Sequence, residues 1–155
     1  MKKLLTFLCA FAVVFSVCGL ALAKDIQVTV NGKAVTFSPN PVSISDRVFV
    51  PMRSIFEYLG ATVQWDGETK SIDASRGDTK IHLAIQDKTM TVNGSNITLD
   101  VPPQLVHNST MVPIRAVSEA FQAAVTWDGK SATVSIVTNP AVEMSNILAL
   151  VGQTK

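Results

Sequence analysis

A long stretch of this chain occurs twice, and this internal repeat constrains the fold more than any other feature of the sequence. VPMRSIFEYLGATVQWDGE, residues 50–68, corresponds to VPIRAVSEAFQAAVTWDGK, residues 112–130. A shift of 62 residues aligns 26–74 with 88–136 without a gap, and 15 of these 49 positions are identical. Duplication at a fixed spacing indicates two copies of one supersecondary unit. We place the copies at residues 24–87 and 88–138.

Each copy begins with the pattern of a β-hairpin. Apolar and polar residues alternate on both sides of Asn31-Gly32 in the first copy and of Asn93-Gly94 in the second. Asn-Gly is typical of two-residue hairpin turns, because both residues tolerate the positive φ that such turns need. A short apolar strand, a short helix and a second hairpin are predicted to follow in each copy.

The predicted helices begin at proline. Pro51 and Pro113 suit the first helical turn, where a missing N–H costs no hydrogen bond. Gly60 is placed to end the first helix in the left-handed conformation, whereas the second copy has Gln122 at this position. A left-handed residue other than glycine costs about 1 kcal/mol, so we expect the second helix to end less sharply. The apolar residues at helical spacing in the first helix are Met52, Ile55, Phe56 and Leu59.

The repeat breaks after residue 138. Asn139 suits a helix N-cap and Pro140 the first turn. Apolar residues then follow at helical spacing: Met144, Ile147, Leu148 and Val151. We therefore predict an amphipathic helix in residues 139–155, which is too short to persist alone in water and must dock. Docking on its own domain is favoured, and docking on a partner protein is the alternative.

The first 23 residues have the features of a secretory signal. Two lysines, an apolar run and Ala-Leu-Ala ending at Ala23 occur in the order of a signal peptide. We expect cleavage after Ala23, which leaves a chain without a membrane span that is secreted or lies on the outer face of the cell envelope. A retained membrane anchor, or a lipoprotein attached through Cys18, is the alternative. Because Cys9 and Cys18 both lie in this segment, the mature chain could form no disulfide.

The charge balance gives no reason to expect a nucleic acid or an anionic membrane as partner. The whole chain has a formal net charge of +1, and loss of Lys2 and Lys3 with the signal changes this to −1. Polyanions are bound by strongly basic surfaces, which this composition does not provide.

Eight motif residues repeat between the copies and are the candidate binding or structural residues. They are Arg53, Glu57, Trp65 and Asp66, with their counterparts Arg115, Glu119, Trp127 and Asp128. The tryptophans could be sugar-stacking platforms, but each shares a strand face with a valine, which favours a core or rim role. The Arg–Glu pairs could bind an acidic ligand, although a structural ion pair one helical turn apart is favoured. The aspartates precede glycine, as in a turn.

The repeat favours a structural role over a catalytic role for these residues. A catalytic site needs unlike groups that converge once, whereas a folding unit needs the same residues in each copy. Arg76-Gly77-Asp78 has the composition of an adhesion motif, but it joins two alternating segments, where we expect a tight turn.

Several motifs together resemble the copper amine oxidase N-terminal-like domain, also called the stalk domain. They are the V-N-G-K hairpin, the V-P-x-R helix start, the glutamate before LGATVQWD, and the second round in MVPIRAVSEAF and VTWD. The resemblance covers nearly all of residues 25–138 and implies a protein of Gram-positive bacteria. It implies an α+β fold: two tandem copies of a β-hairpin/strand/short helix/β-hairpin unit, with antiparallel strands curled around a helix, plus the C-terminal helix. The sequence departs from the family pattern in two places. Gln122 stands where a helix-ending glycine is expected, and NST at 108–110 replaces the usual Asn-Gly-Arg.

The resemblance implies no oxidase chemistry, because the family is named after a non-catalytic domain. Amine oxidation needs three histidine copper ligands and a tyrosine that becomes a quinone, but the chain has only His82, His107 and Tyr58. We expect no catalytic residue, metal ligand or cofactor. The predicted function is a non-catalytic secreted or cell-envelope module with a structural or binding role. Its partner would be a cell-wall polymer, a polysaccharide or another surface protein, and its oligomeric state stays open. The alternative is a small secreted metal-binding protein or hydrolase with an unrecognised site.

Overall fold

The computed structural model describes residues 24–138, which form thirteen β-strands and two short helices. The predicted signal at 1–23 and the predicted helix at 139–155 lie outside the described residues. Over these described residues the fold is mostly β, with three sheets, so the predicted α+β class is wrong. Each helix has only seven residues, because a left-handed residue stops it after two turns, and the remaining apolar segments alternate with the period of strands.

The central sheet, sheet B, joins the two copies. Its order is β10-β11-β4-β3, and all of its pairs are antiparallel. The strands are β3 (Val42–Ile44), β4 (Arg47–Pro51), β10 (Gln104–Val106) and β11 (Ser109–Pro113). Val50 of β4 pairs with Val112 of β11, its own counterpart in the second copy. The repeat exchanges the two neighbouring pairs, Pro51 with Met111 and Phe49 with Pro113. The copies are therefore paired about an approximate twofold axis through this valine pair.

Two flanking sheets combine hairpins from both copies. Sheet A has the order β12-β13-β1-β2, with β1 (Gln27–Val30), β2 (Lys33–Val35), β12 (Ala124–Asp128) and β13 (Thr133–Val137). Sheet C has the order β5-β6-β7-β8-β9, with β5 (Thr62–Asp66), β6 (Ser71–Arg76), β7 (Thr79–Ala84), β8 (Thr89–Val92) and β9 (Ser95–Thr98). In sheet C, β7 lies between hairpins of the two copies. Sheet A has no such strand, and β13 pairs directly with β1 in the parallel direction.

The Asn-Gly hairpin turns are present as predicted. Asn31 and Gly32 have φ of 51° and 76°, and Asn93 and Gly94 have φ of 49° and 83°. Two successive positive φ values give the turn that matches the twist of the flanking strands.

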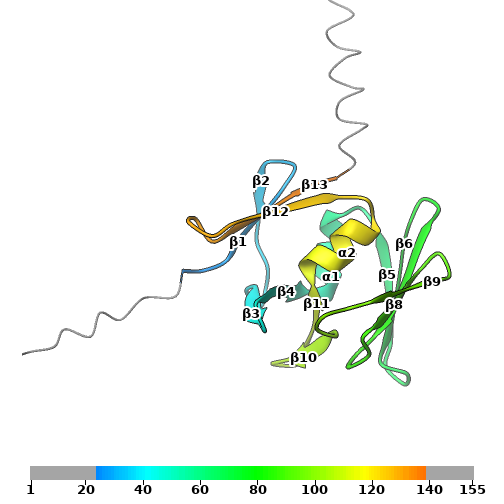
Figure 1. Ribbon diagram of the computed structural model, residues 1–155. Helices are drawn as coiled ribbons and strands as arrows, with labels where there is room; N and C mark the ends of the chain where they lie inside the picture. Colours follow the sequence, from blue (N-terminus) through cyan, green and yellow to red (C-terminus); the bar gives the residue numbers. More distant parts are fainter. Residues whose placement is uncertain (1–23, 139–155) are drawn as a thin grey trace, which may run out of the picture.

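The helices α1 (Met52–Tyr58) and α2 (Ile114–Ala120) follow β4 and β11 and lie between sheets A and C, against sheet B (Figure 1). Their buried faces form one core with the inner faces of the sheets. The Phe56 ring of α1 meets the Phe121 ring, which follows α2, edge to face, with 6.0 Å between the ring centres. The predicted difference between the helix ends is wrong, because Gln122 adopts the left-handed conformation of Gly60, with φ of 61° against 72°.

Candidate functional site

The structure places the eight candidate residues in two separate sets, one on each side of the twofold axis. Arg53 and Glu57 lie on α1, and Arg115 and Glu119 lie on α2. The tryptophans and aspartates lie on β5 and β12, which are edge strands of different sheets: Trp65, Asp66, Trp127 and Asp128. The eight residues therefore do not converge on one site.

The repeated Arg–Glu pairs are weak surface pairs. Arg115 Nε lies 4.0 Å from Glu119 Oε1, and both side chains are 56% exposed. Arg53 and Glu57 are also exposed, and within residues 24–138 no ion pair joins them. Solvent screens such charges, so these arginines contribute little to stability and keep donors that can face a ligand.

The tryptophans lie at the rim and not in the core. Trp65 is 39% exposed and Trp127 is 46% exposed. Trp127 pairs with Val134 across the hairpin, so its side chain is on the inner face of sheet A, where the strand edge leaves part of the ring open. Gly129 follows two residues later, and a Cβ there would lie 3.5 Å from the indole Nε1.

The aspartates Asp66 and Asp128 shape the turns of the second hairpins, as predicted. Asp66 Oδ1 accepts a hydrogen bond from the Glu68 N–H at 2.8 Å, and this bond is the main cause that lowers the pKa of Asp66. Asp128 accepts from the Ser131 hydroxyl at 2.7 Å and from the Lys130 N–H at 2.9 Å, and the hydroxyl is the main cause that lowers its pKa. Each carboxylate therefore holds a turn and stays ionised at neutral pH.

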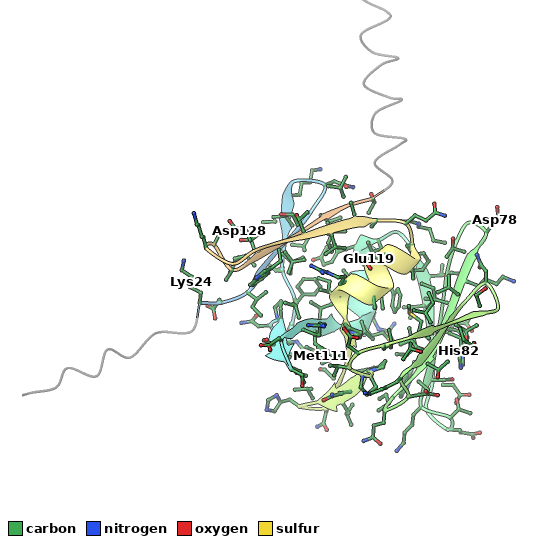
Figure 2. All side chains as sticks on the ribbon, viewed as in Figure 1. Lys24, Asp78, His82, Met111, Glu119 and Asp128 are labelled. Atoms are coloured by element: carbon green, nitrogen blue, oxygen red, sulfur yellow. The ribbon has the colours of Figure 1, made fainter. Side chains whose placement is uncertain are left out.

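One concave site is a partly open groove with a volume of about 960 Å³, here called the Trp127 groove. Its apolar wall comes from sheet A and includes Val125, Trp127 and Val134, and its other walls come from β3, β4 and α2. Six charged residues line it: Lys24, Asp25, Asp46, Arg47, Asp100 and Arg115. Figure 2 shows Lys24 and Asp128 together at the outer end of sheet A, and Glu119 on α2 beside the core. Both copies contribute to the groove.

An ion pair between the copies forms part of the lining of this groove. Arg47 donates from Nε and Nη2 to Asp100 Oδ2, at 3.0 and 2.6 Å. The repeat could not reveal this pair, because the equivalent positions hold Ser109 and Ser38. Both residues also line a second cavity of about 310 Å³, which lies between α2 and β9.

The equivalent segments in the other half of the molecule are packed more closely. The segment after β7 bonds to the segment before β10, with the Gln86 N–H donating to the Pro103 oxygen at 2.8 Å. Pro103 is buried, whereas its counterpart Pro41 is only half-buried and lines the Trp127 groove. The extra strand β7 brings Gln86 to this place, so the two copies have the same motif but different access.

Arg76 is the main structural residue that the repeat did not identify. Its guanidinium donates to the carbonyl oxygens of Leu59, at 2.9 Å, and of Phe121, and it lies 5.2 Å above the Phe121 ring. Leu59 and Phe121 are the C-caps of α1 and α2, so one side chain binds the ends of both helices. Its counterpart is Thr138, which explains why matching the copies missed it. The Arg-Gly-Asp stretch is a turn between β6 and β7, as predicted, and its arginine is engaged in the core.

The two histidines lie apart. His82 of β7 bonds to Asp73 of β6 at 2.8 Å, and His107 lies in the turn between β10 and β11. Across residues 24–138, no cluster of three or more His, Cys, Asp or Glu side chains has the arrangement of a metal site. Neither of the helices in this range is long and apolar enough to span a membrane.

Comparison with known proteins supports one family. The model of the family "Copper amine oxidase N-terminal domain" matches residues 29–136, which confirms the resemblance that the sequence motifs indicated. A "Protease inhibitor" of Brevibacillus choshinensis is 29% identical over 111 residues, which cover 72% of this chain. The matched region spans 34% of that relative, about a third of its length.

Proposed function

Since the chain belongs to the copper amine oxidase N-terminal domain family, we propose that it is a non-catalytic binding module that holds its ligand in the Trp127 groove. The observation that carries this proposal is the groove itself, which both copies build and which exposes an aromatic ring beside charged side chains. Large concave sites with a few polar groups are the usual ligand sites of proteins.

The arrangement of the groove favours binding over catalysis. Its carboxylates and cations are exposed, and the best-placed arginine, Arg47, is already paired with Asp100. Catalytic acids and bases usually have a pKa shifted towards neutrality by burial. Asp66 and Asp128, which do not line the groove, have a lowered pKa instead and hold turns. An unrecognised hydrolase or metal site is therefore the weaker alternative.

The signal-like segment at 1–23 supports a secreted or cell-envelope location. The partner proposed for this location is a cell-wall polymer. A nucleic acid or an anionic membrane is a poor alternative, because the mature chain is close to neutral. The name of the matched relative favours a second candidate, in which the module binds a protease.

A groove-blocking variant tests the proposal on the mature chain, residues 24–155. Ser43→Trp places a large ring at the groove, which Ser43 lines, while Leu105→Trp makes the same addition at the equivalent, exposed position of the second copy. We expect the wild-type protein and Leu105→Trp to sediment with purified Gram-positive cell wall, and Ser43→Trp to stay in solution. Equal melting temperatures would show that all three proteins are folded.

The same three proteins separate the two candidates. If Ser43→Trp sediments with the wall to the same extent as the wild type, the groove is not the wall-binding site. Inhibition of a secreted serine protease by the wild type and Leu105→Trp but not by Ser43→Trp, without wall binding, would assign the groove to a protease instead.

A further inference from the structure

We infer that the Trp127 groove binds a neutral glycan chain, with a pyranose ring stacked on Trp127. This inference rests on the proposed function and specifies the chemistry of its ligand. It combines three features of the groove: an open aromatic ring, a balance of charges, and a position on the face of a sheet.

The aromatic ring is the first feature. Trp127 is 46% exposed although it lies on the inner face of sheet A, so one side of the indole is open to the groove. The neighbouring wall positions Gly129 and Ala132 are small, and a Cβ at Gly129 would lie only 3.5 Å from the indole Nε1. A flat apolar ring with a polar edge matches a sugar ring, which has an apolar C–H face and hydroxyls around its rim.

The charge balance is the second feature. The three cations of the groove, Lys24, Arg47 and Arg115, are matched by three carboxylates, Asp25, Asp46 and Asp100. A ligand with a net charge would gain attraction from one set and repulsion from the other. Hydroxyl groups both donate and accept, so a neutral sugar can use the donors and the acceptors together.

The position on a sheet face is the third feature, and it argues against a peptide. Extended peptides usually bind along a free strand edge, where backbone N–H and C=O groups pair with them. β12 is an edge strand, but the groove wall at Trp127 and Val134 presents side chains from the face of sheet A. The volume of about 960 Å³ is at the upper end of ligand sites, which leaves room for several sugar rings.

The second copy provides a control inside the same chain. Trp65 has the same strand position, the same following glycine and a similar exposure of 39%. In this half, however, a hydrogen bond joins Gln86 to Pro103, the counterparts of Lys24 and Pro41, which line the Trp127 groove. If groove access decides binding, Trp65 should make no contribution although its ring is nearly as exposed. If any exposed tryptophan suffices, both rings should contribute.

The test is isothermal titration calorimetry of residues 24–155 with four defined hexamers. Chitohexaose and cellohexaose are neutral, hexagalacturonate adds one carboxylate to each ring, and hexaglutamate has the charge without the sugar. We expect the neutral hexamers to bind more tightly than the two anions. Their Kd should change less than about twofold between 50 and 500 mM NaCl, because no net charge is screened. Trp127→Ala should weaken binding by about tenfold or more, and Trp65→Ala by less than about twofold.

Several outcomes would overturn the inference. Tighter binding of hexagalacturonate with a steep loss in salt would identify charge as the determinant, and tighter binding of hexaglutamate would identify a peptide ligand. Equal losses of affinity in Trp127→Ala and Trp65→Ala would show that the groove is not the binding site. Failure of both neutral hexamers while the wall is still bound through a groove that Ser43→Trp blocks would refute the glycan and leave the proposed function intact.

Discussion

Val50 of β4 lies opposite Val112 of β11, and each valine is the counterpart of the other in the repeat. Both side chains are fully buried, with 0% exposure. The twofold axis of the molecule therefore passes through its core, and the copies share one hydrophobic interior instead of meeting at a domain interface.

The shared core predicts matched effects of mutation in the two copies. Val50→Ala and Val112→Ala should each lower the free energy of unfolding by about 2 kcal/mol, because each removes two buried methyl groups from an equivalent place. Urea unfolding followed by circular dichroism would measure both. Each variant should keep a single transition, and two resolved transitions would show that the copies unfold independently.

Arg76 should be among the most important polar residues for stability. Arg76→Ala leaves the carbonyl oxygens of Leu59 and Phe121 without this donor, so we expect a loss of about 2–3 kcal/mol in the free energy of unfolding. Arg76→Lys, which lacks the planar fork, should recover only part of it. A loss below about 0.5 kcal/mol for Arg76→Ala would show that water replaces the guanidinium at both helix ends.

The repeated arginines should behave differently from Arg76. Arg53 and Arg115 are exposed, and the only ion pair at either position has a distance of 4.0 Å among the residues of known structure. Arg53→Ala and Arg115→Ala should each change the free energy of unfolding by less than about 1 kcal/mol. Chemical denaturation would measure this, and a larger loss at either position would show that the arginine has a structural role.

A substitution at the end of α2 should stabilise the protein. Gln122 has a positive φ of 61°, which costs energy for any residue with a Cβ. Gln122→Gly should therefore raise the free energy of unfolding by about 0.5–1 kcal/mol, and the reciprocal Gly60→Gln should lower it by a similar amount. Thermal unfolding of the two variants would measure this difference. A melting temperature of Gln122→Gly below that of the wild type would mean that the glutamine side chain makes a compensating contact.

The turn aspartates make a contribution that depends on pH. Because the folded-state pKa of Asp66 and Asp128 is lower than the ordinary value of 3.8, their stabilisation is present above that value and is lost as the pH falls through the folded pKa. Asp128→Asn should melt below the wild type at about pH 7, and this difference should vanish at about pH 2. A difference in melting temperature that persists at the lower pH would assign the effect to packing.

The repeat predicted the local elements well. The Asn-Gly turns, the helix positions after Pro51 and Pro113, and the apolar face of α1 all follow from short-range rules of backbone geometry and periodicity. The fold class was wrong because a seven-residue helix occupies little of a chain in which almost every other segment is a strand. Nor could the sequence show that β13 pairs with β1, since long-range pairing depends on which edges remain free after folding.

The candidate site was harder to predict for a related reason. Matching the copies finds the residues that the two halves share, and those residues maintain the common architecture. The groove is open on one side because of differences between the copies: Arg47 against Ser109, and an extra strand that brings Gln86 to Pro103. Trp127 was identified, but its access to a groove depends on that asymmetry, which no comparison of the two motifs reveals.

The parallel pairing of β1 with β13 also determines when the protein can fold. Gln27 pairs with Thr133, so the first strand needs a neighbour that is synthesised near the end of the repeat pair. Until then β1 and β2 form an isolated hairpin, which is only marginally stable in water. Contacts between such distant parts of a chain slow folding, because a long loop must close before they form. The growing chain therefore stays incompletely folded until β13, the last strand of the described residues, has emerged from the ribosome and completes sheet A.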